Sequence, residues 1–415
     1  MTVAFKTFGC RLNRAESASF EASFAAAGFE RVPFGTRADV VVFHTCAVTQ
    51  SAENECLKLI RSLRKKEPSA VLVMAGCAVE AAARDTLHAL GVDLIVCRES
   101  KEDLVPIVQR HLGLDRSAGA AVPVRSTKRA SLKIQDGCDF FCAYCIVPHT
   151  RGLPRSRPFD DCLAEARAFI AAGFQEIVVT GCNIACYSDG RRGLVDLLAA
   201  LAGLTGLGRL RLGSIEPGTV ELEVAALMAE TETLCKFLHL PLQSGDDAVL
   251  ARMGRRYTRA QLAATVSQAL ALMPDLSLGA DFICGFPGET AEAFKQTLLL
   301  AETFPFSKLH VFPYSERPGT PACGFEGAVP VPERQRRTKL LIEQGQAQRS
   351  RFAQRFLGKP VELLVERFDP EGRACGWSGE YLPCVVRGVP RDRLRALCAF
   401  TPERVQGDTL YGGIS

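Results

Sequence analysis

The chain has no apolar run that approaches the roughly 20 residues a bilayer-spanning helix needs, so no membrane segment is expected. Its first residues, MTVAFKTFGC, contain neither the block of positive charge nor the cleavage site of a secretory leader. We therefore expect a cytoplasmic protein. The excess of positive over negative charge is also small, because 50 lysines and arginines against 46 aspartates and glutamates leave a net charge of +4. Any surface that attracts a polyanion must therefore be local.

Cysteine, by contrast, is abundant. The chain has 415 residues, enough for two or three domains, and its 47% hydrophobic and 23% charged content is typical of a globular protein. It contains 17 cysteines. In a cytoplasmic protein of this length, cysteines indicate metal ligands and small buried residues rather than a disulfide framework.

Three cysteines stand close together in the stretch QDGCDFFCAYCIVPHTRG, which runs from Gln135 to Gly152. Cys138, Cys142 and Cys145 form a CxxxCxxC pattern. Three thiolates from one loop can hold three irons of a [4Fe–4S] cluster and leave the fourth iron open to another ligand. Structural zinc usually has four protein ligands, and a redox CxxC pair needs two. The spacing therefore predicts an open-site cluster.

Residues 1–122 alternate short β-rich runs with amphipathic helical stretches, a pattern that predicts a flavodoxin-like parallel α/β domain. The expected strands are Val3–Phe8, Asp39–His44, Ala70–Ala75 and Asp93–Val96, and the expected helices are Ala15–Ala27, Ser51–Lys65, Val79–Leu90 and Lys101–Leu112. Cys10, Cys46 and Cys77 each follow one of the first three strands. Because the carboxyl ends of parallel strands share one edge of the sheet, we expect these thiols to form a second three-cysteine cluster site. Asn13 fits either a helix cap or a place in that site.

Residues 128–355 contain six further strand–helix units, which predict a partial (βα)6 barrel of the TIM type. Its expected strands are Leu132–Gln135, Glu176–Thr180, Arg209–Gly213, Lys236–Leu240, Leu276–Ile283 and Lys308–Phe312. Active sites of such barrels lie at the carboxyl ends of the strands. The cysteine loop occupies one of these ends.

Polar residues at the other strand ends suit a ligand that has a nucleoside and an amino-acid head group. Glu216 could hold an ammonium group or ribose hydroxyls, and Gly285 lets the backbone approach an adenine closely. Further hydrogen-bonding groups for the same ligand are Asn183, Ser214, Gln243 and Ser244. Each residue alone has an ordinary explanation, such as a helix-start charge or a turn. The prediction rests on their occurrence around one barrel mouth.

The C-terminal part combines a basic helix with a small β-rich region. In the helical stretch Val331–Lys359, the part from Arg334 to Arg355 carries seven arginines and lysines, opposed only by Glu333 and Glu343. A solvated charged face is the usual explanation of such a run, but charge this one-sided is expected of a surface that lies along phosphates. Residues 356–415 contain short β-rich runs that predict a small RNA-binding barrel. Trp377 and Tyr381 could stack on a base, and packing in the small core is an equally good explanation.

Taken together, these motifs resemble a known family. CxxxCxxC at the start of a six-unit barrel resembles the radical S-adenosylmethionine (SAM) superfamily. The resemblance narrows to the methylthiotransferases through TRG at 150–152, SIEP at 214–217, HLPLQSG at 239–245, RRYTR at 255–259, DFICGFPGET at 281–290 and FPYSERPGTPA at 312–322. These motifs add Tyr144, Arg255, Asp281 and Phe312 to the expected cofactor-binding residues. Departures from the family pattern are His44, which stands where asparagine is more common, and Cys182 and Cys186, which we assign to packing.

The resemblance implies a division of labour between two [4Fe–4S] clusters. Cys138, Cys142 and Cys145 would be catalytic, since the cluster they hold binds SAM and cleaves it to a 5′-deoxyadenosyl radical. The cluster on Cys10, Cys46 and Cys77 would carry or donate the sulfur that is inserted into the substrate. The resemblance also implies a flavodoxin- or ferredoxin-type electron donor, a C-terminal domain similar to TRAM and a tRNA anticodon-loop substrate. We expect the protein to be a monomer.

Three branches of this family differ in substrate. They act on threonylcarbamoyladenosine in tRNA, on isopentenyladenosine in tRNA, or on an aspartate of a ribosomal protein. The segment KIQDGCDFFCAYCIVPHTRGLPRSRP, residues 133–158, is most similar to the sequences of the first branch. Enzymes of that branch insert a methylthio group at carbon 2 of N6-threonylcarbamoyladenosine beside the anticodon. From other classes, a non-catalytic iron–sulfur electron carrier would need four protein ligands per cluster. A plain RNA-binding module would leave six cysteines at strand ends unexplained.

Overall fold

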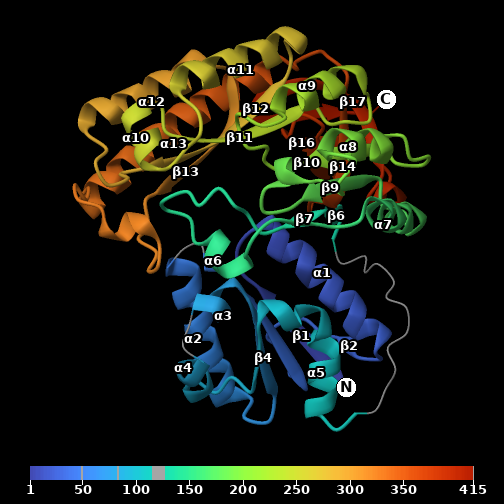
Figure 1. Cartoon of the computed structure of the whole chain (residues 1–415). Coiled ribbons are helices and arrows are strands. Elements are labelled where there is room, and N and C mark those ends of the chain that lie inside the picture. Colours follow the sequence, from blue (N-terminus) through green and yellow to red (C-terminus); the bar gives the residue numbers. More distant parts are fainter. Residues whose placement is uncertain (48–49, 82–83, 115–126, 415) are drawn as a thin grey trace.

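The computed structural model describes residues 1–47, 50–81, 84–114 and 127–414, which form three β-assemblies surrounded by helices (Figure 1). The expected end of the first domain at residue 122 lies outside the described residues. Among the described residues no helix has the length and apolar character needed to cross a bilayer.

The N-terminal sheet is parallel and has the strand order β2-β1-β3-β4-β5. Its strands are β1 Thr2–Thr7, β2 Glu30–Arg31, β3 Val40–Thr45, β4 Val71–Gly76 and β5 Leu94–Val96. This is the flavodoxin-like order, so the predicted fold of this region is confirmed. The sequence did not reveal β2, because two exposed residues form no pattern.

Helices cover both faces of this sheet (Figure 1). They are α1 Arg11–Ala26, α2 Gln50–Lys66, α3 Cys77–Ala81, α4 Arg84–Ala89, η1 Arg98–Asp103 and α5 Leu104–His111. Alternate residues of β3 belong to different cores: Val40 and Val42 pack with α1 and α5, whereas Val41 and Phe43 pack with α2. A strand buried on both faces explains the unbroken apolar run VVVF. Within the helix expected over Val79–Leu90, the described residues on either side of 82–83 belong to α3 and α4, and α3 begins at Cys77, two residues earlier than expected.

The central region is a partial barrel made of two three-stranded parallel sheets, β6-β9-β10 and β11-β12-β13. The strands are β6 Ala130–Lys133, β9 Glu176–Thr180, β10 Arg209–Leu212, β11 Phe237–Gln243, β12 Ser277–Cys284 and β13 Phe306–Pro313. An isolated bridge between Leu210 and Leu234 joins the two sheets. The six expected strands are therefore present, and the predicted partial (βα)6 barrel is confirmed.

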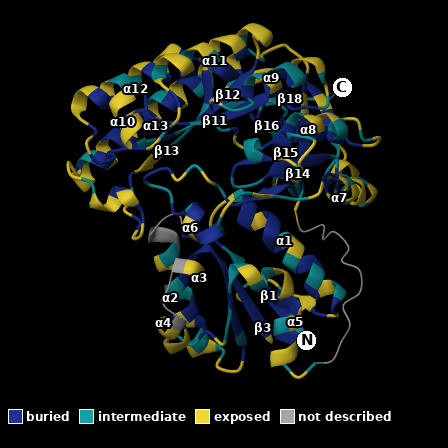
Figure 2. Ribbon diagram, in the orientation of Figure 1, coloured by how far each residue is buried: buried dark blue, intermediate teal, exposed yellow. Residues whose placement is uncertain are grey.

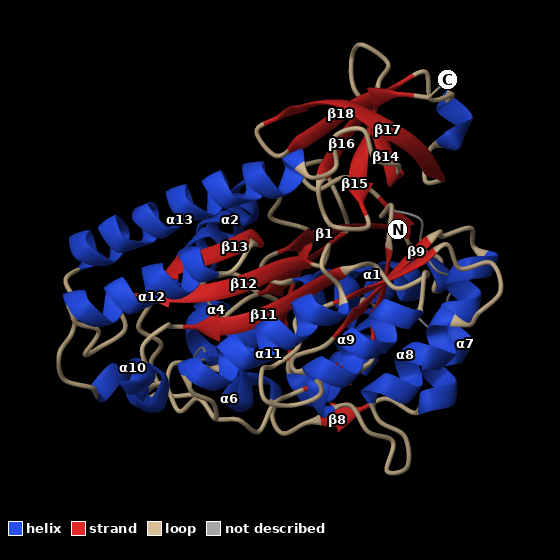
Figure 3. Cartoon of the chain, turned by 90° about the horizontal axis from the view of Figure 1, so that it is seen from above, coloured by secondary structure: helices blue, strands red, loops and turns tan. Residues whose placement is uncertain are grey.

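Helices wrap the outside of this barrel (Figure 3), and Figure 2 shows their buried residues on the side that faces the strands. They are α7 Phe159–Ala171, α8 Leu194–Ala202, α9 Glu221–Glu230, α10 Asp247–Arg252, α11 Arg259–Leu272, α12 Ala291–Thr303 and α13 Val331–Gln354. Shorter elements are α6 Val147–Arg151, the β7 Gln135–Asp136 and β8 Arg155–Ser156 pair, η2 Ile184–Cys186, η3 Pro321–Gly324 and η4 Arg391–Arg393.

The C-terminal residues form a closed barrel with the order β14-β15-β16-β18-β17. Its strands are β14 Val361–Phe368, β15 Ala374–Ser378, β16 Pro383–Arg387, β17 Leu397–Gln406 and β18 Thr409–Gly413. The first residues of β10 and β12 bind this small barrel, since Arg209 donates to the carbonyl of Trp377 and Ser277 to that of Glu380. It therefore packs at the amino ends of the central strands, opposite the cysteine loop.

Candidate cluster and cofactor sites

The structure brings the N-terminal cysteines to one edge of the first sheet. Cys46 follows β3, while Cys10 and Cys77 begin helices after β1 and β4. Glycines with positive φ precede the last two: a Cβ on Gly9 would lie 2.6 Å from the Cys46 Sγ, and one on Gly76 only 2.4 Å from the Thr45 carbonyl. These glycines let the strand ends approach closely enough for the thiols to gather.

Asn13 and Arg151 connect Cys10 with Cys77. The Asn13 side chain is fully buried and donates to the carbonyls of Phe8 and Thr45. Its Oδ1 accepts from the Arg151 Nη2 at 2.6 Å and lies 3.6 Å from the Cys10 Sγ, and the Arg151 Nε donates to the Cys77 Sγ at 3.1 Å. Cys10 occupies the N-cap of α1. Asn13 is therefore part of the cysteine site and does not cap the helix.

A buried carboxylate, Glu16, joins this site to the barrel. It accepts from Arg151 of α6 at 3.1 Å, from Lys133 of β6 at 2.6 Å and from Lys101 at 3.1 Å. His44, which is fully buried, lies 3.2 Å away and bonds Ser17 through its other ring nitrogen. Burial alone would raise the pKa of Glu16, but the His44 hydrogen bond and the three cations together lower it well below its usual range.

We expect Glu16→Gln to destabilise the docking of the first domain on the barrel by about 3 to 5 kcal/mol, because buried cations would lose their shared partner. The measurement is the midpoint of chemical unfolding, with the exposed helix change Glu343→Gln as the control. Since the pKa of Glu16 is lowered on folding, its contribution is present above about pH 4.5, its unfolded value, and declines below that. Equal midpoints for the two variants at neutral pH would contradict this role.

The barrel cysteines lie in a loop held by the backbone. Cys138 N–H donates to the Gly152 carbonyl at 3.0 Å, and Cys145 N–H donates to the Cys142 carbonyl at 2.9 Å. Burial raises the pKa of the Cys138 thiol and raises that of Cys145 to about 12, and neighbouring cysteines act in the same direction. Thiolates crowded in this way need nearby positive charge, which a bound iron cluster supplies. The donor set therefore fits a [4Fe–4S] cluster with three protein ligands.

The short helix α6 separates the two cysteine sites. It begins directly after the Cys145 loop and ends at Arg151, which contacts Cys77. Ile146 packs in the same core as Cys46 and Cys77. A helix of five residues is about 7.5 Å long. The two sites thus face each other across one short element at the centre of the molecule (Figure 1).

Several predicted cofactor residues meet beside the Cys142 thiol. The Arg255 guanidinium donates to the Cys142 Sγ at 3.2 Å and to the Tyr144 hydroxyl at 3.3 Å, and it pairs with Glu216. Asn183 Nδ2 lies 4.0 Å from the Cys138 Sγ. Among the described residues, the buried Asn183 Oδ1 and Gln243 Oε1 have no hydrogen-bond partner. Free acceptors at the carboxyl ends of two barrel strands fit the ammonium and hydroxyl groups of SAM.

The remaining predicted cofactor residues have other surroundings. Ser214 is exposed, and the Ser244 hydroxyl lies 3.4 Å from that of Thr297 and accepts from the Asp246 N–H. Gly285 faces α13, where a Cβ would lie 2.3 Å from Arg334. Asp281 lies between two histidines, and Phe312 is half exposed.

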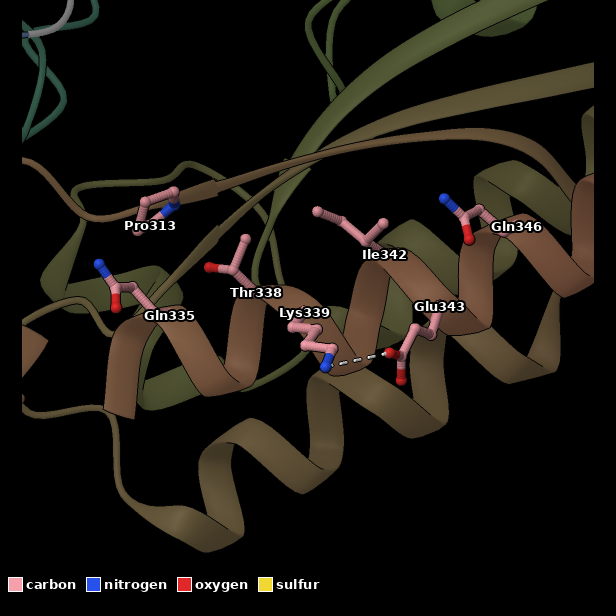
Figure 4. Close-up of a pocket in the computed structure, with 7 residues that line it drawn as sticks. All are labelled: Pro313, Gln335, Thr338, Lys339, Ile342, Glu343 and Gln346. Atoms are coloured by element: carbon pink, nitrogen blue, oxygen red, sulfur yellow. Dashed lines mark ion pairs between the residues drawn. The ribbon is translucent and has the colours of Figure 1, made fainter. Parts of the chain in front are cut away.

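The expected phosphate-binding stripe on α13 is mostly neutralised. Six of its seven basic residues make ion pairs, and all but Arg336 and Lys339 have a partner outside the helix: Arg334 with Glu316, Arg336 with Glu333, Arg337 with Glu289, Lys339 with Glu343, Arg349 with Asp408, and Arg355 with Asp275. The sequence could show only the acids on the helix itself. A free basic surface along α13 was therefore the wrong expectation. Figure 4 shows a pocket on this helix, and no predicted cofactor residue lines it.

Comparisons with known proteins identify the families of the first two parts of the chain. Residues 132–301 match the radical SAM superfamily, and residues 2–97 match the uncharacterized protein family UPF0004. The threonylcarbamoyladenosine tRNA methylthiotransferase MtaB of Bacillus subtilis is 32% identical over 94% of this chain and 91% of its own. The MtaB of Thermotoga maritima is 33% identical over 92% and 90%.

The chain belongs to the methylthiotransferase family. Within the family, the tRNA-2-methylthio-N(6)-dimethylallyladenosine synthase of Novosphingobium aromaticivorans is 36% identical over 88% of this chain and 87% of its own, so identity alone does not separate the branches. Membership of the radical SAM superfamily implies SAM and a [4Fe–4S] cluster for this methylthiotransferase. The radical SAM methyltransferase TsrM of Kitasatospora setae shares the fold, with a TM-score of 0.59 at 14% identity over 77% of this chain and 73% of its own.

Some residues of the methylthiotransferase site escaped the sequence reasoning. Arg151 was visible only as part of the TRG motif, and nothing marked Glu16 as its partner. Lys308 and His310 stood in the expected strand Lys308–Phe312. Their polar side chains at alternate positions of an otherwise apolar strand were the signal that could have indicated a functional face.

Proposed function

We propose that this protein inserts a methylthio group at carbon 2 of N6-threonylcarbamoyladenosine beside the anticodon of tRNA. Two [4Fe–4S] clusters would serve it, one on Cys138, Cys142 and Cys145 and one on Cys10, Cys46 and Cys77. The observation that carries the proposal is the placement of these two three-thiol sites on either side of α6. A plain electron carrier would have no need for two incomplete ligand sets that face each other.

The protein's own side chains hold and orient the reactants. When bound, the clusters and SAM supply the one-electron chemistry and the sulfur for breaking the C–H bond. Arg255 places positive charge beside the Cys142 thiolate and fixes Tyr144 and Glu216 around the cofactor. Arg151 places positive charge beside Cys77, and α6 keeps the two sites apart. Cys10 is exposed, which leaves that site open to the adenosine.

The remaining parts of the proposal concern partners. Residues 1–122 would hold the auxiliary cluster, residues 128–355 the SAM cluster, and residues 356–415 would bind the RNA. A flavodoxin- or ferredoxin-type donor would supply electrons to a monomer in the cytoplasm, where tRNA is found. The dimethylallyladenosine branch is the second candidate, because a relative of that name is 36% identical.

The proposal is tested by nucleoside mass spectrometry of tRNA from cells that lack the protein and from cells that re-express it. We expect 2-methylthio-N6-threonylcarbamoyladenosine to disappear, threonylcarbamoyladenosine to accumulate, and re-expression to reverse both changes. Re-expression of the Cys142→Ala variant should reverse neither change. A change confined to methylthio-dimethylallyladenosine would favour the second branch. No change in either nucleoside would exclude both tRNA substrates.

A further inference from the structure

Four cations converge on the ring of Tyr381, a residue of the C-terminal barrel. Their distances to the ring centroid are 4.1 Å for the Lys308 Nζ and 4.6, 5.2 and 5.7 Å for the Cζ atoms of Arg211, Arg11 and Arg129. The cations come from α1, from the two halves of the central barrel and from the segment before β6, whereas the ring belongs to the C-terminal barrel. Cation–π contact with one ring cannot balance four like charges that all lie within 6 Å of it.

Carboxylates balance only two of these cations. Glu176 pairs with Arg211 at 2.8 Å, and Glu366 pairs with Arg129 at 2.8 Å. Lys308 and Arg11 have no ion pair within the part of the chain that the structure describes, and Arg11 donates only to the Tyr381 hydroxyl, at 2.6 Å. Burial, with the charges of the surrounding arginines, lowers the pKa of Lys308 to about 7. Partly buried cations without a counter-charge are costly unless a ligand brings one.

The site is open toward the barrel mouth. Lys308, His310 and Phe312 lie at alternate positions of the edge strand β13 and so share one face. Exposure increases along that face, from partly buried Lys308 to 38% for the His310 side chain and 48% for Phe312. Trp377, stacked on Tyr381 with centroids 5.0 Å apart, lies beside Lys308. A strip of aromatic and cationic groups thus leads from the mouth inward.

We propose that Lys308 and Arg11 bind the carboxylate of the threonylcarbamoyl group and thereby select this substrate over adenosines with an uncharged N6 substituent. This inference rests on the proposed function. Charged N–H groups on a carboxylate form strong hydrogen bonds. A site built to pair with a charged group also rejects an analogue that lacks it, because the cations would then stay unpaired. An apolar dimethylallyl group would bury the same cations without a partner.

The size of the substituent agrees with the site. From the adenine ring to the carboxylate the arm is roughly 6 Å long by standard C–N and C–C bond lengths. Two residues of a strand, the step from His310 to Lys308, span about 6.6 Å. A carboxylate at Lys308 therefore leaves the adenine beside His310 and Phe312. Arg11 directly follows Cys10, so the same position brings the base close to the auxiliary cysteine site.

The test measures binding of two anticodon stem-loop RNAs to the cluster-loaded protein. One RNA carries N6-threonylcarbamoyladenosine, and the other carries the same group as its uncharged threonine amide. We expect the wild-type protein to bind the carboxylate RNA more tightly than the amide RNA. The Lys308→Met variant should bind the carboxylate RNA about tenfold to a hundredfold more weakly and the amide RNA with unchanged affinity. Lys308→Arg, which keeps the charge, should restore most of the preference. Lys295→Met, an exposed lysine on α12, is the matched control and should behave as wild type.

Other outcomes separate the explanations. Equal weakening of both RNAs by Lys308→Met would mean that the anion is a backbone phosphate and would overturn the carboxylate assignment. An unchanged preference in Lys308→Met would overturn it as well. If the wild-type protein binds the carboxylate RNA selectively but does not methylthiolate it, the proposed function fails and the anion site stands.

The pH dependence of binding gives an independent readout. The charged groups that face Lys308 are Arg11, Arg129, Arg211 and Arg349, with Tyr381 and His310 as its other titratable neighbours. Because the free amine has a pKa of about 7 and the carboxylate binds its charged form, binding above pH 7 requires proton uptake. The Kd for the carboxylate RNA should therefore rise about fivefold from pH 7 to pH 8. The same rise in Lys308→Met would contradict the inference.

Discussion

Replacing Cys138, Cys142 and Cys145 together with alanine is expected to abolish cleavage of SAM and, with it, all methylthio transfer. No other group in the described barrel offers three thiols from one loop, so the loss should be complete. Iron content after anaerobic reconstitution should fall from about eight to about four atoms per chain. The measurements are iron analysis and the yield of 5′-deoxyadenosine under reducing conditions.

The control is Cys323→Ala, which removes an exposed thiol at η3 and should leave both quantities unchanged. Residual 5′-deoxyadenosine formation in the triple variant would show that the open-site cluster has other ligands. Full iron content with no cleavage would place the defect in cofactor binding.

Replacing Cys10, Cys46 and Cys77 together with alanine is expected to separate the two halves of the reaction. SAM should still be cleaved at close to the normal rate, because these residues lie beyond α6 from the loop that would bind it. Methylthio transfer should fall below detection, because no sulfur would remain at the auxiliary site. Nucleoside mass spectrometry and 5′-deoxyadenosine yield, measured on the same samples, check both statements.

Cys56→Ala is the matched control for this set, because Cys56 is buried in the core under the same sheet edge without a place in the cysteine site. It should retain methylthio transfer. Persistent transfer in the triple variant would remove the auxiliary role from these cysteines. Loss of SAM cleavage as well would mean that Arg151 and Glu16 transmit the change to the barrel.

Patterns set by short-range physics were predictable from the sequence. Apolar runs such as Val40–Phe43 predicted buried parallel strands, and cysteines directly after three such runs predicted convergence at one edge. Four strands of the first sheet and the six central strands followed from the same signal. Strands without a pattern were missed, including Glu30–Arg31 and Ala374–Ser378.

Long-range pairing was beyond the sequence. The arginines of α13 suggested a free basic face, yet their carboxylate partners come from loops of the central region and from the C-terminal barrel. Glu16 gave no sign that it would meet Arg151 at 135 positions' distance. Such contacts depend on how whole domains dock, and the local propensities of a sequence do not predict domain docking.

The brevity of α6 has a consequence for how the chain can vary. The helix makes about one and a half turns, so one inserted residue would rotate its end by about 100° and carry Arg151 away from Cys77. The number of residues between the last barrel cysteine and Arg151 therefore fixes where Arg151 lies relative to the cysteine loop. In the proposed reaction, the length of this stretch would set the separation over which a substrate atom activated at one cysteine site meets the sulfur at the other.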